Sequence, residues 1–453
     1  MSVLRVLNKT FSGGIHVKEN KYTSSITIQS LPEPKVVVLP VIQHTGAPAV
    51  AVVKVGDRVC VGQKVASAAE GLVSAPVHAS ISGKVTSIEE RLHPTLHKKV
   101  TSIIIESDGE NKLHENVGIE RNAELFTKEE LLSIIRDSGV VGLGGAGFPT
   151  AVKLSPPKNK KIDTFVLNAC ECEPYITSDE RLLIEHGKEI VEGMKIMMFI
   201  LGVRAGYIGI EDNKPEAIKT LSGIVEKEKK YNIKLEVLKT KYPQGGEKQL
   251  IYSILRRKVP LGKLPLDVGV VVNNVATAYA VYKAVKFNIP LIERVVTVTG
   301  ENIPTRGNFR TKIGTLVSEI LHFCKINVED ITAGGKYTKI ILGGPMMGVA
   351  QYTADVPVIK TTNCILILRG SVTLAEDKGC IRCSRCVLHC PMRLMPNFIA
   401  FYSERRLFEE ARRYGALDCI ECGVCAYVCP GKRPLVQLIK FAKASLLATK
   451  AKM

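Results

Sequence analysis

A chain of 453 residues has room for about three domains of roughly 100 to 200 residues each. It has no apolar, charge-free run of about 18 residues, and Met1–Thr10 lacks the features of a signal peptide. We therefore expect no transmembrane helix and a cytosolic protein. The net charge of +18 favours acidic partners. Nucleic acid is disfavoured, because the chain has no Trp and no alternation of basic with aromatic residues.

A small all-β unit is predicted over residues 31–110. Short β-branched runs such as Val36–Leu39 are separated by turns rich in Gly and Asp, which is typical of short paired strands. The segments Val55–Gln63 and Ala75–Val85 resemble the barrel-sandwich, or lipoyl-like, module of biotinyl and lipoyl carriers. Those carriers present a Lys at a hairpin tip. The matching segment 70–76 has none, so we expect a structural or docking module.

Alternating helices and strands are predicted over residues 126–290. Thr127 and Glu130 form a capping-box pattern that predicts a helix through Asp137. Apolar runs predict strands at 164–167, 207–210 and 268–272, and helical spacing predicts helices at 178–201 and 214–230. This order indicates an α/β layer with a largely parallel sheet. A β-rich unit at 291–365, which begins with the strand Arg294–Thr299, follows it.

A glycine-rich loop, Gly142–Thr150, lies near the start of the α/β unit. Gly142, Gly144 and Gly147 match G-x-G-x-x-G, but a helix rather than a strand leads into the loop, so the pattern does not predict a dinucleotide fold. Residues without Cβ let backbone N–H groups approach a phosphate closely. We therefore predict phosphate binding, with a plain turn as the alternative.

Four segments in the same order resemble the NADH-oxidising, FMN-binding subunit of respiratory complex I. They are Gly142–Lys153, Asn168–Pro174, Tyr242–Glu247 and Val272–Thr277. The resemblance implies an FMN site, and its candidate residues are Gly142, Gly144, Gly145, Gly147, Phe148, Lys153, Asn168, Tyr242, Gly245, Glu247, Asn273, Asn274 and Thr277. The unit at 126–290 is thus expected to be a complex I flavoprotein-like α/β domain.

The same resemblance implies a catalytic role for Glu171 and Glu173, over the flavin face where the nicotinamide of NAD(H) stacks. Carboxylates there would fix the carboxamide and ribose, because the protein's part in hydride transfer is orientation and charge. Two solvated turn residues are the alternative. The chain departs from complex I at Cys170, Cys172 and Gly246, which bears on nucleotide contacts more than on FMN.

Two cysteine runs in the last unit, 366–453, share the spacing C-x2-C-x2-C-x3-C-P. In bacterial two-cluster ferredoxins each such run binds a 4Fe-4S cluster, and its fourth Cys ligates the other cluster. On that pattern one cluster takes Cys380, Cys383, Cys386 and Cys429, and the other takes Cys419, Cys422, Cys425 and Cys390. Zinc ribbons use two ligands per knuckle, and disulfide frameworks belong to short secreted chains, so the spacing favours two clusters in a ferredoxin-like α+β domain.

The remaining cysteines carry weaker predictions. Cys60, Cys324 and Cys364 are expected to be buried thiols. Cys170 and Cys172 fall short of a metal site, because two ligands without a nearby His are too few.

The order of barrel-sandwich, flavin, β-grasp-like and two-cluster units is similar to the C subunit of Rnf complexes along nearly the whole chain. The predicted N-terminal arm, 1–30, shares Phe11–His16 with that family, although Val17 stands where a Pro often follows. The resemblance implies an NAD-reactive subunit, peripheral at the cytoplasmic face of the membrane. Its partners would be the membrane-embedded and ferredoxin-like subunits of an ion-translocating ferredoxin:NAD oxidoreductase.

Two alternatives stay open at this stage. A corrinoid reductase of diol-utilising microcompartments resembles the same modules, and a relay protein with a vestigial flavin fold is an alternative from a different class. The basic runs 380–400 and 431–453 contain no acid, which favours an acidic ferredoxin or a membrane surface as partner. The apolar period of Leu435–Leu446 predicts a helix, either packed on the cluster unit or bound to a partner or membrane.

Overall fold

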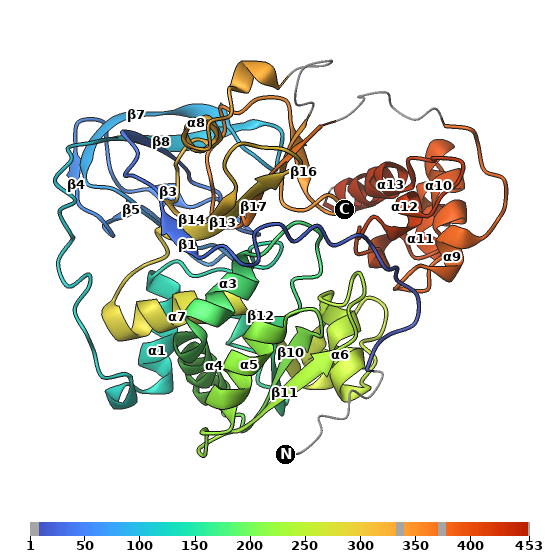
Figure 1. Ribbon diagram of the computed structural model, residues 1–453, viewed down its shortest axis with the longest axis horizontal. Coiled ribbons are helices and arrows are strands. Elements are labelled where there is room, and N and C mark those ends of the chain that lie inside the picture. Colours follow the sequence, from blue (N-terminus) through green and yellow to red (C-terminus); the bar gives the residue numbers. More distant parts are fainter. Residues whose placement is uncertain (1–8, 332–338, 370–376, 452–453) are drawn as a thin grey trace.

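The computed structural model describes residues 9–331, 339–369 and 377–451. Parts of the predicted arm (1–8), of the unit at 291–365 (332–338) and of the cluster unit (370–376 and 452–453) lie outside the described residues. Figure 1 shows the α/β unit below two β-rich units, with the cluster unit to one side. The arm runs between these bodies from the cluster unit to the β-rich units (Figure 1).

The all-β unit consists of two short antiparallel sheets. One has the order β2 (Val36–Pro40), β8 (Lys99–Ser107), β7 (Gly83–Leu92) and β4 (Arg58–Val59); the other has β3 (Val50–Ala51), β5 (Lys64–Ser67) and β6 (Val77–His78). Val65, Ile103 and Ile105 are among the fully buried residues in its core. In β2 and β8 alternate residues, Val37 and Leu39 and then Ile103 and Ile105, face this core, whereas in β5 the adjacent Val65 and Ala66 both do.

The α/β unit is built on a parallel sheet in the order β11-β10-β9-β12. The strands are β9 (Thr164–Ala169), β10 (Ala205–Glu211), β11 (Asn232–Leu238) and β12 (Val270–Asn274). The helices are α1 (Lys128–Asp137), α2 (Thr150–Lys153), α3 (Ser178–Glu185), α4 (Gly187–Leu201), α5 (Pro215–Val225), α6 (Glu247–Leu255) and α7 (Val275–Phe287). The predicted capping box of α1 is confirmed, since Thr127 and Glu130 exchange both capping hydrogen bonds.

Several predicted bounds in this unit differ from the structure, and β9 and β10 are each longer than the predicted strands 164–167 and 207–210. The helix expected over 178–201 is broken at His186, whose backbone leaves the helical conformation. The His186 ring stacks on the Tyr279 ring, with 4.7 Å between the ring centroids. The helix expected over 214–230 ends at Val225. The strand expected from 268 begins at Val270 because a 3-10 turn precedes it. Short 3-10 turns occupy Ala123–Leu125, Pro265–Val268, Val328–Asp330 and Ala416–Asp418.

The third unit contains a mixed sheet in the order β1-β14-β13-β17-β15-β16. Its elements are β1 (Ile28–Ser30), β13 (Glu293–Gly300), β14 (Gly307–Lys312), α8 (Val317–Phe323), β15 (Lys339–Leu342), β16 (Val349–Gln351) and β17 (Cys364–Leu368). β13 and β17 run parallel at the centre, and β1 adds an edge strand parallel to β14. The arm is therefore part of this sheet, which the sequence did not predict.

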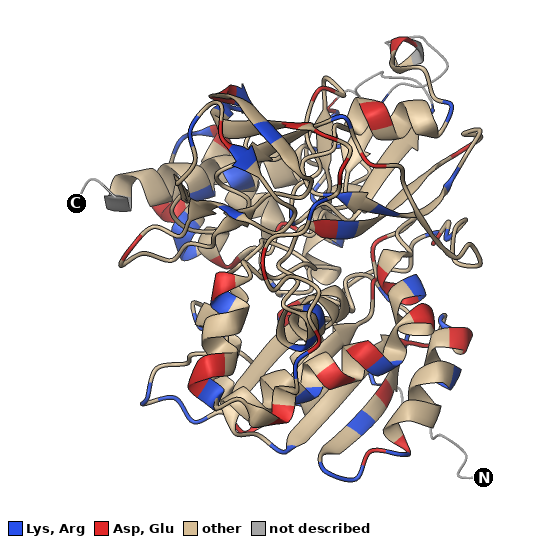
Figure 2. Cartoon of the chain, turned by 90° about the vertical axis from the view of Figure 1, so that its left-hand side faces the viewer, with Lys and Arg blue, Asp and Glu red and all other residues tan. Residues whose placement is uncertain are grey.

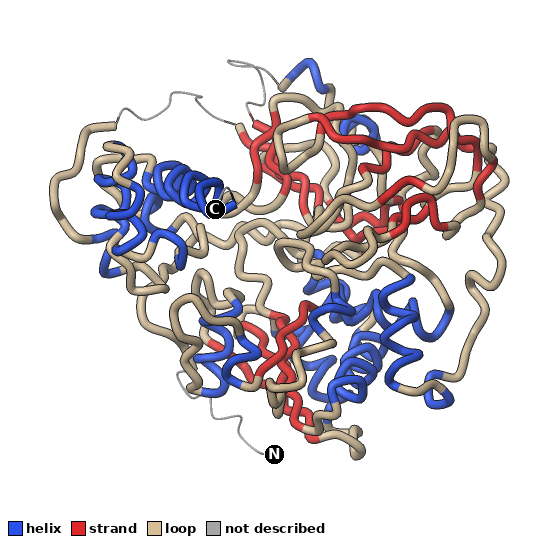
Figure 3. The backbone as a smooth tube through the Cα atoms, turned by 180° about the vertical axis from the view of Figure 1, so that it is seen from behind, coloured by secondary structure: helices blue, strands red, loops and turns tan. Residues whose placement is uncertain are grey.

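The cluster unit differs from the predicted α+β fold. Its described part, 377–451, contains helices and no strand, and Figure 3 shows helices and loops there from behind. The helices are α9 (Arg385–Leu388), α10 (Pro396–Glu404), α11 (Phe408–Arg413), α12 (Val424–Tyr427) and α13 (Leu435–Ala451). Apolar residues at helical spacing, including Ile399, Ala411 and Ile439, pack together in one core, and this packing favours helices over a β-ribbon.

The last helix, α13, packs on the cluster unit, as one of the two predicted alternatives requires. Leu435, Ile439, Ala442 and Leu446 are buried against the other helices of the unit. None of the helices among the described residues combines the length and apolar character needed to cross a membrane.

Charge is distributed unevenly over the chain. Basic and acidic residues are intermingled along the helices of the α/β unit (Figure 2). In the cluster unit, by contrast, Arg382, Arg385 and Arg393 are exposed within the segment 380–400, which has no acid. In the second predicted basic run, 431–453, Lys432 and Lys440 are exposed, while Arg433, Lys440 and Lys443 pair with acids from other segments.

Candidate functional site

The parallel sheet has a switch point between β9 and β12. The chain passes from β9 to β10 and β11 on one side and then returns to form β12 on the other side of β9. Ligands of open α/β sheets bind beyond the carboxyl ends of the strands at such a point. Asn168 and Asn274 pair across it, so the fold brings predicted FMN residues from distant segments together.

The glycine-rich loop lies over this switch point. A Cβ on Gly144 would stand 2.9 Å from the Asn274 side chain, whereas a Cβ on Gly145 would meet nothing within 4 Å. Gly147 has a φ of +69°, and a Cβ there would lie 2.7 Å from Thr361. The loop thus has one covered side and one open side, as a backbone that approaches a phosphate requires.

Neighbouring contacts hold both ends of the loop. The Gly142 N–H donates to Phe148 O at 2.9 Å, and the Leu143 N–H donates to Thr277 Oγ1 at 2.9 Å. The buried Arg294 donates to Leu143 O at 3.3 Å. Thr277 therefore orients the loop by accepting a hydrogen bond from its backbone. The sequence analysis named Thr277 as an FMN candidate but did not predict this contact.

Four further FMN candidates pair with one another from distant segments. Lys153 Nζ lies 2.7 Å from Glu247 Oε1, and the Asn168 amide donates to Gly245 O at 2.8 Å. Asn273 Nδ2 is buried with no hydrogen-bond partner in the described parts of the chain. A buried donor without a partner is costly. Open glycine backbone, a cation and a free amide donor fit a phosphate-bearing group such as FMN.

Glu171 lies at the N-terminus of α3. Its carboxylate accepts hydrogen bonds from the N–H groups of Asp179, at 2.6 Å, and Glu180, at 3.1 Å, where the helix dipole favours negative charge. The Asp179 carboxylate in turn accepts from the Asn274 amide at 2.6 Å. Burial, followed by the charge of Glu171, raises the pKa of Asp179 to about 7. Glu171 thus positions an acid that contacts a predicted FMN residue.

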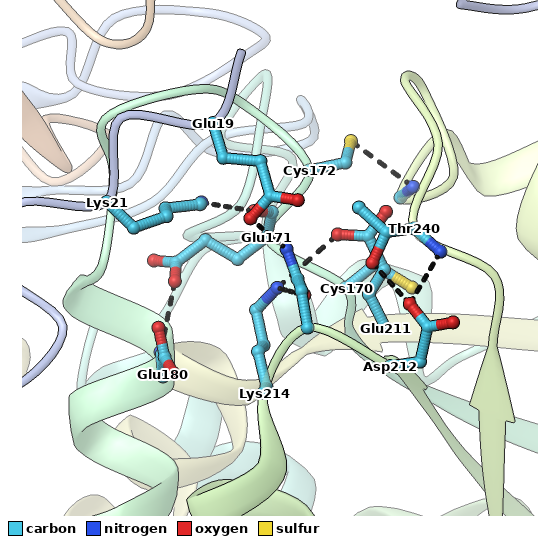
Figure 4. Close-up of polar contacts among 12 residues, drawn as sticks. Glu19, Lys21, Cys170, Glu171, Cys172, Glu180, Glu211, Asp212, Lys214 and Thr240 are labelled. Atoms are coloured by element: carbon cyan, nitrogen blue, oxygen red, sulfur yellow. Dashed lines mark hydrogen bonds and ion pairs between the residues drawn. The ribbon is translucent and has the colours of Figure 1, made fainter. Parts of the chain in front are cut away.

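A buried ionic network beside Glu171 was not predicted (Figure 4). Lys21 of the arm donates to the carbonyl oxygens of Glu171, at 2.8 Å, and Glu173, at 2.9 Å. Lys214 and Glu211 form an ion pair at 3.3 Å, with both side chains 1% exposed. The role of Lys21 could not be predicted from the sequence, because its partners lie about 150 residues away and only the fold brings them together.

Glu173 contacts a second glycine-containing loop, around Gly344. Its carboxylate accepts from the N–H groups of Met346, at 3.2 Å, and Met347, at 2.9 Å, and its Oε1 lies 3.3 Å from the Tyr242 hydroxyl. A Cβ on Gly344 would lie 2.1 Å from a Glu173 oxygen, so only glycine permits this approach. Burial raises the pKa of Glu173 to about 7. The glycines of this loop were an available signal that the sequence analysis did not use.

Four of the predicted cluster ligands line one cavity in the helical unit, and we call them the inner set. They are Cys390, Cys419, Cys422 and Cys425. All but Cys419 are buried. In the described ranges, no three His, Cys, Asp or Glu side chains are placed to hold a single metal ion. A cluster is larger than one ion, so thiols that surround a cavity fit it.

The other four predicted ligands, which we call the outer set, are more accessible. Cys380 and Cys383 are exposed, and Cys386 and Cys429 are half-buried. Lys378 N donates to Gly431 O at 3.0 Å, close to Cys429. The end of the second run therefore lies beside the start of the first, as the exchange of fourth ligands requires.

Among the other cysteines, Cys324 and Cys364 are fully buried, as predicted. Cys60 is half-buried instead, because its neighbours Val59 and Val61 take the core-facing positions.

Cys170 and Cys172 lie under the flavin candidates as separate thiols. Cys170 is buried and donates to Gly209 O at 3.5 Å, whereas Cys172 accepts from Gly245 N at 3.3 Å. Burial raises the pKa of both thiols. They are therefore neutral groups that pack beneath the site.

Three family models match the chain in the predicted order. Residues 9–110 match the RnfC barrel sandwich hybrid domain, 135–283 match the Nuo51 FMN-binding domain, and 373–430 match a 4Fe-4S dicluster domain. These matches confirm the predicted barrel-sandwich, FMN-binding and two-cluster units.

Relatives match over almost the whole length. The chain is 44% identical over 439 residues to the C subunit of the proton-translocating ferredoxin:NAD(+) oxidoreductase complex of Clostridium ljungdahlii, covering 96% of this chain and 94% of that one. It is 41% identical over 454 residues to the C subunit of the Na(+)-translocating ferredoxin:NAD(+) oxidoreductase complex of Acetobacterium woodii, covering 99% and 100%. A solved NAD+-reducing NiFe hydrogenase in the H2-reduced state has a TM-score of 0.48 and 16% identity, over 72% of this chain and 63% of that one. The two sequence matches show that the chain belongs to the RnfC family, the C subunits of ion-translocating ferredoxin:NAD(+) oxidoreductase (Rnf) complexes.

Proposed function

We propose that this chain is the peripheral subunit of an ion-translocating ferredoxin:NAD oxidoreductase complex, in which NAD(H) exchanges electrons with FMN and two 4Fe-4S clusters. One observation carries the proposal: a glycine-loop site at a sheet switch point and two sets of four thiols share one polypeptide, and direct hydrogen bonds join the site to the inner set. The names of the relatives support the same activity.

The residues at the switch point would hold FMN. Gly145 offers open backbone to its phosphate, Lys153, which is paired with Glu247, offers a cation, and Asn273 offers an unpartnered amide donor. FMN, when bound, takes the two electrons of a hydride together and releases them singly to one-electron clusters. The chain's own part is to orient the cofactor and to keep charged groups at fixed distances from it.

Glu171 and Glu173 are proposed to act on the nicotinamide side as positioning carboxylates. Glu171 fixes α3, and through Asp179 it fixes the Asn274 amide. The neutral thiol of Cys172 adds no charge to a bound dinucleotide. The two carboxylates would therefore act on NAD(H) through the backbone and amide groups that they fix.

The two thiol sets are proposed to have different roles. The inner set lies against the α/β unit, where Gln249 donates to Pro391 O at 3.2 Å. The outer set includes the exposed Cys380 and Cys383. We therefore assign the inner set to the cluster nearer FMN and the outer set to the cluster that meets the partner.

A ferredoxin-like subunit or an acidic ferredoxin is the proposed partner. Arg382, Arg385 and Arg393 are exposed close to the outer set in sequence, and Ile381 and Leu388 of the same segment are 65% and 71% exposed. Exposed cations together with exposed apolar side chains favour an acidic protein over a bare lipid surface, because lipid headgroups offer no apolar match. Membrane-embedded subunits of the complex would hold the chain at the cytoplasmic face.

The domain boundaries are also proposals. We assign 31–110 to the barrel-sandwich unit, 126–290 to the FMN unit, 291–365 to a β-grasp-like unit and 366–453 to the cluster unit, with an arm at 1–30. The order β14-β13-β17-β15-β16, with β13 and β17 parallel, supports the β-grasp-like assignment.

Rapid mixing of the anaerobic, cofactor-loaded chain with NADH tests the proposed function. We expect flavin absorbance to bleach first, cluster absorbance to fall next, and added acidic ferredoxin to be reduced at a rate that falls with ionic strength. Visible absorbance that NADH leaves unchanged would contradict the proposal. Faster reduction of an added corrinoid than of ferredoxin would favour a corrinoid reductase instead.

A further inference from the structure

One side chain, Tyr242, joins the FMN unit to the inner set. Its hydroxyl donates to the backbone oxygen of Cys422 at 2.8 Å and also lies 3.3 Å from Glu173 Oε1. A hydroxyl has a single proton, so the shorter distance marks the Cys422 carbonyl as its main acceptor. The side chain is 2% exposed, and water therefore does not compete for these contacts.

The backbone of Tyr242 is fixed as firmly as its side chain. It exchanges two hydrogen bonds with Ile15 of the arm, at 2.9 and 2.8 Å, and the adjacent Gly14 N–H donates to His389 O at 2.8 Å. His389 precedes the inner-set ligand Cys390. The arm backbone at Gly14 and Ile15 is thus hydrogen-bonded both to Tyr242 and to the end of the first cysteine run.

The Cys422 loop also packs closely on the loop that binds Glu173. A Cβ on Gly423 would lie 2.8 Å from Met346 O, and Met346 N donates to Glu173. Ile15, Tyr242, Cys422 and Val424 form one small apolar core at this junction. The inner set is therefore fixed to the FMN unit by hydrogen bonds and packing together.

We infer that Tyr242 is a positioning residue for electron transfer between the FMN site and the inner cluster, and that it links the Glu173 carboxylate to that cluster through the Cys422 carbonyl. The inference rests on the proposed function for its electron path, and it differs from the FMN-binding role that the complex I resemblance implies. Hydrogen bonds and charges around a cluster tune its potential. The O–H dipole points its positive end at the Cys422 peptide and so favours the reduced cluster.

Tyr242→Phe tests the inference, because it removes one oxygen and keeps the ring. We expect the variant to retain its FMN and iron, to show a more negative midpoint potential for the inner cluster alone, and to transfer electrons from flavin to the clusters about tenfold more slowly. Tyr22→Phe is the matched control. It removes an arm hydroxyl that bonds to Asn20, and both cluster potentials should stay unchanged.

Glu173→Gln provides a second measurement with the opposite sign. The amide removes negative charge near the inner cluster, so the potential of that cluster should shift to more positive values at pH of about 8, above the pKa of about 7 of Glu173. EPR-monitored titration with a chemical reductant reads both potentials without NADH, so the result stands apart from the test of the proposed function. Unchanged inner potentials in both variants would overturn the inference. So would loss of FMN from Tyr242→Phe with the inner potential unchanged.

Discussion

The two cysteine sets have the same spacing in sequence and very different surroundings in the fold. Three of the four inner-set cysteines are buried, and the loops that carry the set contact the FMN unit, the arm and the loop around Met346. The outer set includes the exposed Cys380 and Cys383 beside exposed arginines. The spacing of the cysteines therefore predicts which cofactor is bound. The residues around each set determine the group with which that cluster is expected to exchange electrons.

The largest expected effect comes from removing one ligand of each set. Cys425→Ser should lower the iron content by about half and stop electron flow from reduced flavin to ferredoxin, because the inner cluster lies on the only proposed route. Cys383→Ser should lose as much iron but keep fast transfer from flavin to the inner cluster, with only ferredoxin reduction lost. Iron analysis and stopped-flow absorbance after NADH addition measure both variants.

The contrast between the two serine variants is itself the control, because each loses one cluster. If Cys383→Ser blocked flavin reoxidation as completely as Cys425→Ser, the inner and outer assignments would be wrong.

The difference between the two sets also shows what the sequence could predict. The ligands, the glycine loop and the order of the units followed from local spacing and from the resemblance, and the fold brings the candidates Gly144, Asn168 and Asn274 to one switch point. The contacts of Tyr242 and Lys21 could not be predicted. Both depend on the arm, whose pairing with Tyr242 joins residues 227 positions apart in sequence and carries no periodic signal.

The helical form of the cluster unit was missed for a related reason. The cysteine motif fixes only the tight loops around the ligands. The segments between and after the runs, such as Pro396–Glu404 and Leu435–Ala451, carry helical apolar spacing of their own, and their mutual packing determines the fold there.

Two glycines beside the ligands offer a smaller and well-matched test. Gly379 and Gly423 have similar positive φ values, +76° and +79°, so an Ala at either costs about 1–2 kcal/mol in backbone strain. A Cβ on Gly379 meets nothing within 4 Å, whereas one on Gly423 meets the Met346 backbone oxygen at 2.8 Å. Gly423→Ala should therefore destabilise the inner cluster more than Gly379→Ala destabilises the outer cluster, by about 1–3 kcal/mol beyond the backbone strain that the two variants share.

Loss of cluster absorbance in guanidinium chloride measures both glycine variants. Equal midpoints for Gly379→Ala and Gly423→Ala would mean that the Met346 loop moves away from an added Cβ without loss of stability. The proposal that the inner set is docked rigidly on this loop would then be wrong.

The smallest expected effect is a pH dependence confined to the inner cluster. Burial raises the pKa of Glu173 to about 7, and Tyr242 and Lys21 are the other titratable groups that contact this residue. Below that pH the carboxyl is neutral. Above it, the negative charge disfavours an added electron on the nearby cluster, so the inner midpoint potential should fall as pH rises through about 7. In the described parts of the chain Glu173 contacts no outer-set cysteine, so the potential of the outer cluster should stay constant over the same pH range. Glu173→Gln should hold the inner potential at its low-pH value throughout, and a slope that persists in this variant would assign the titration to another group.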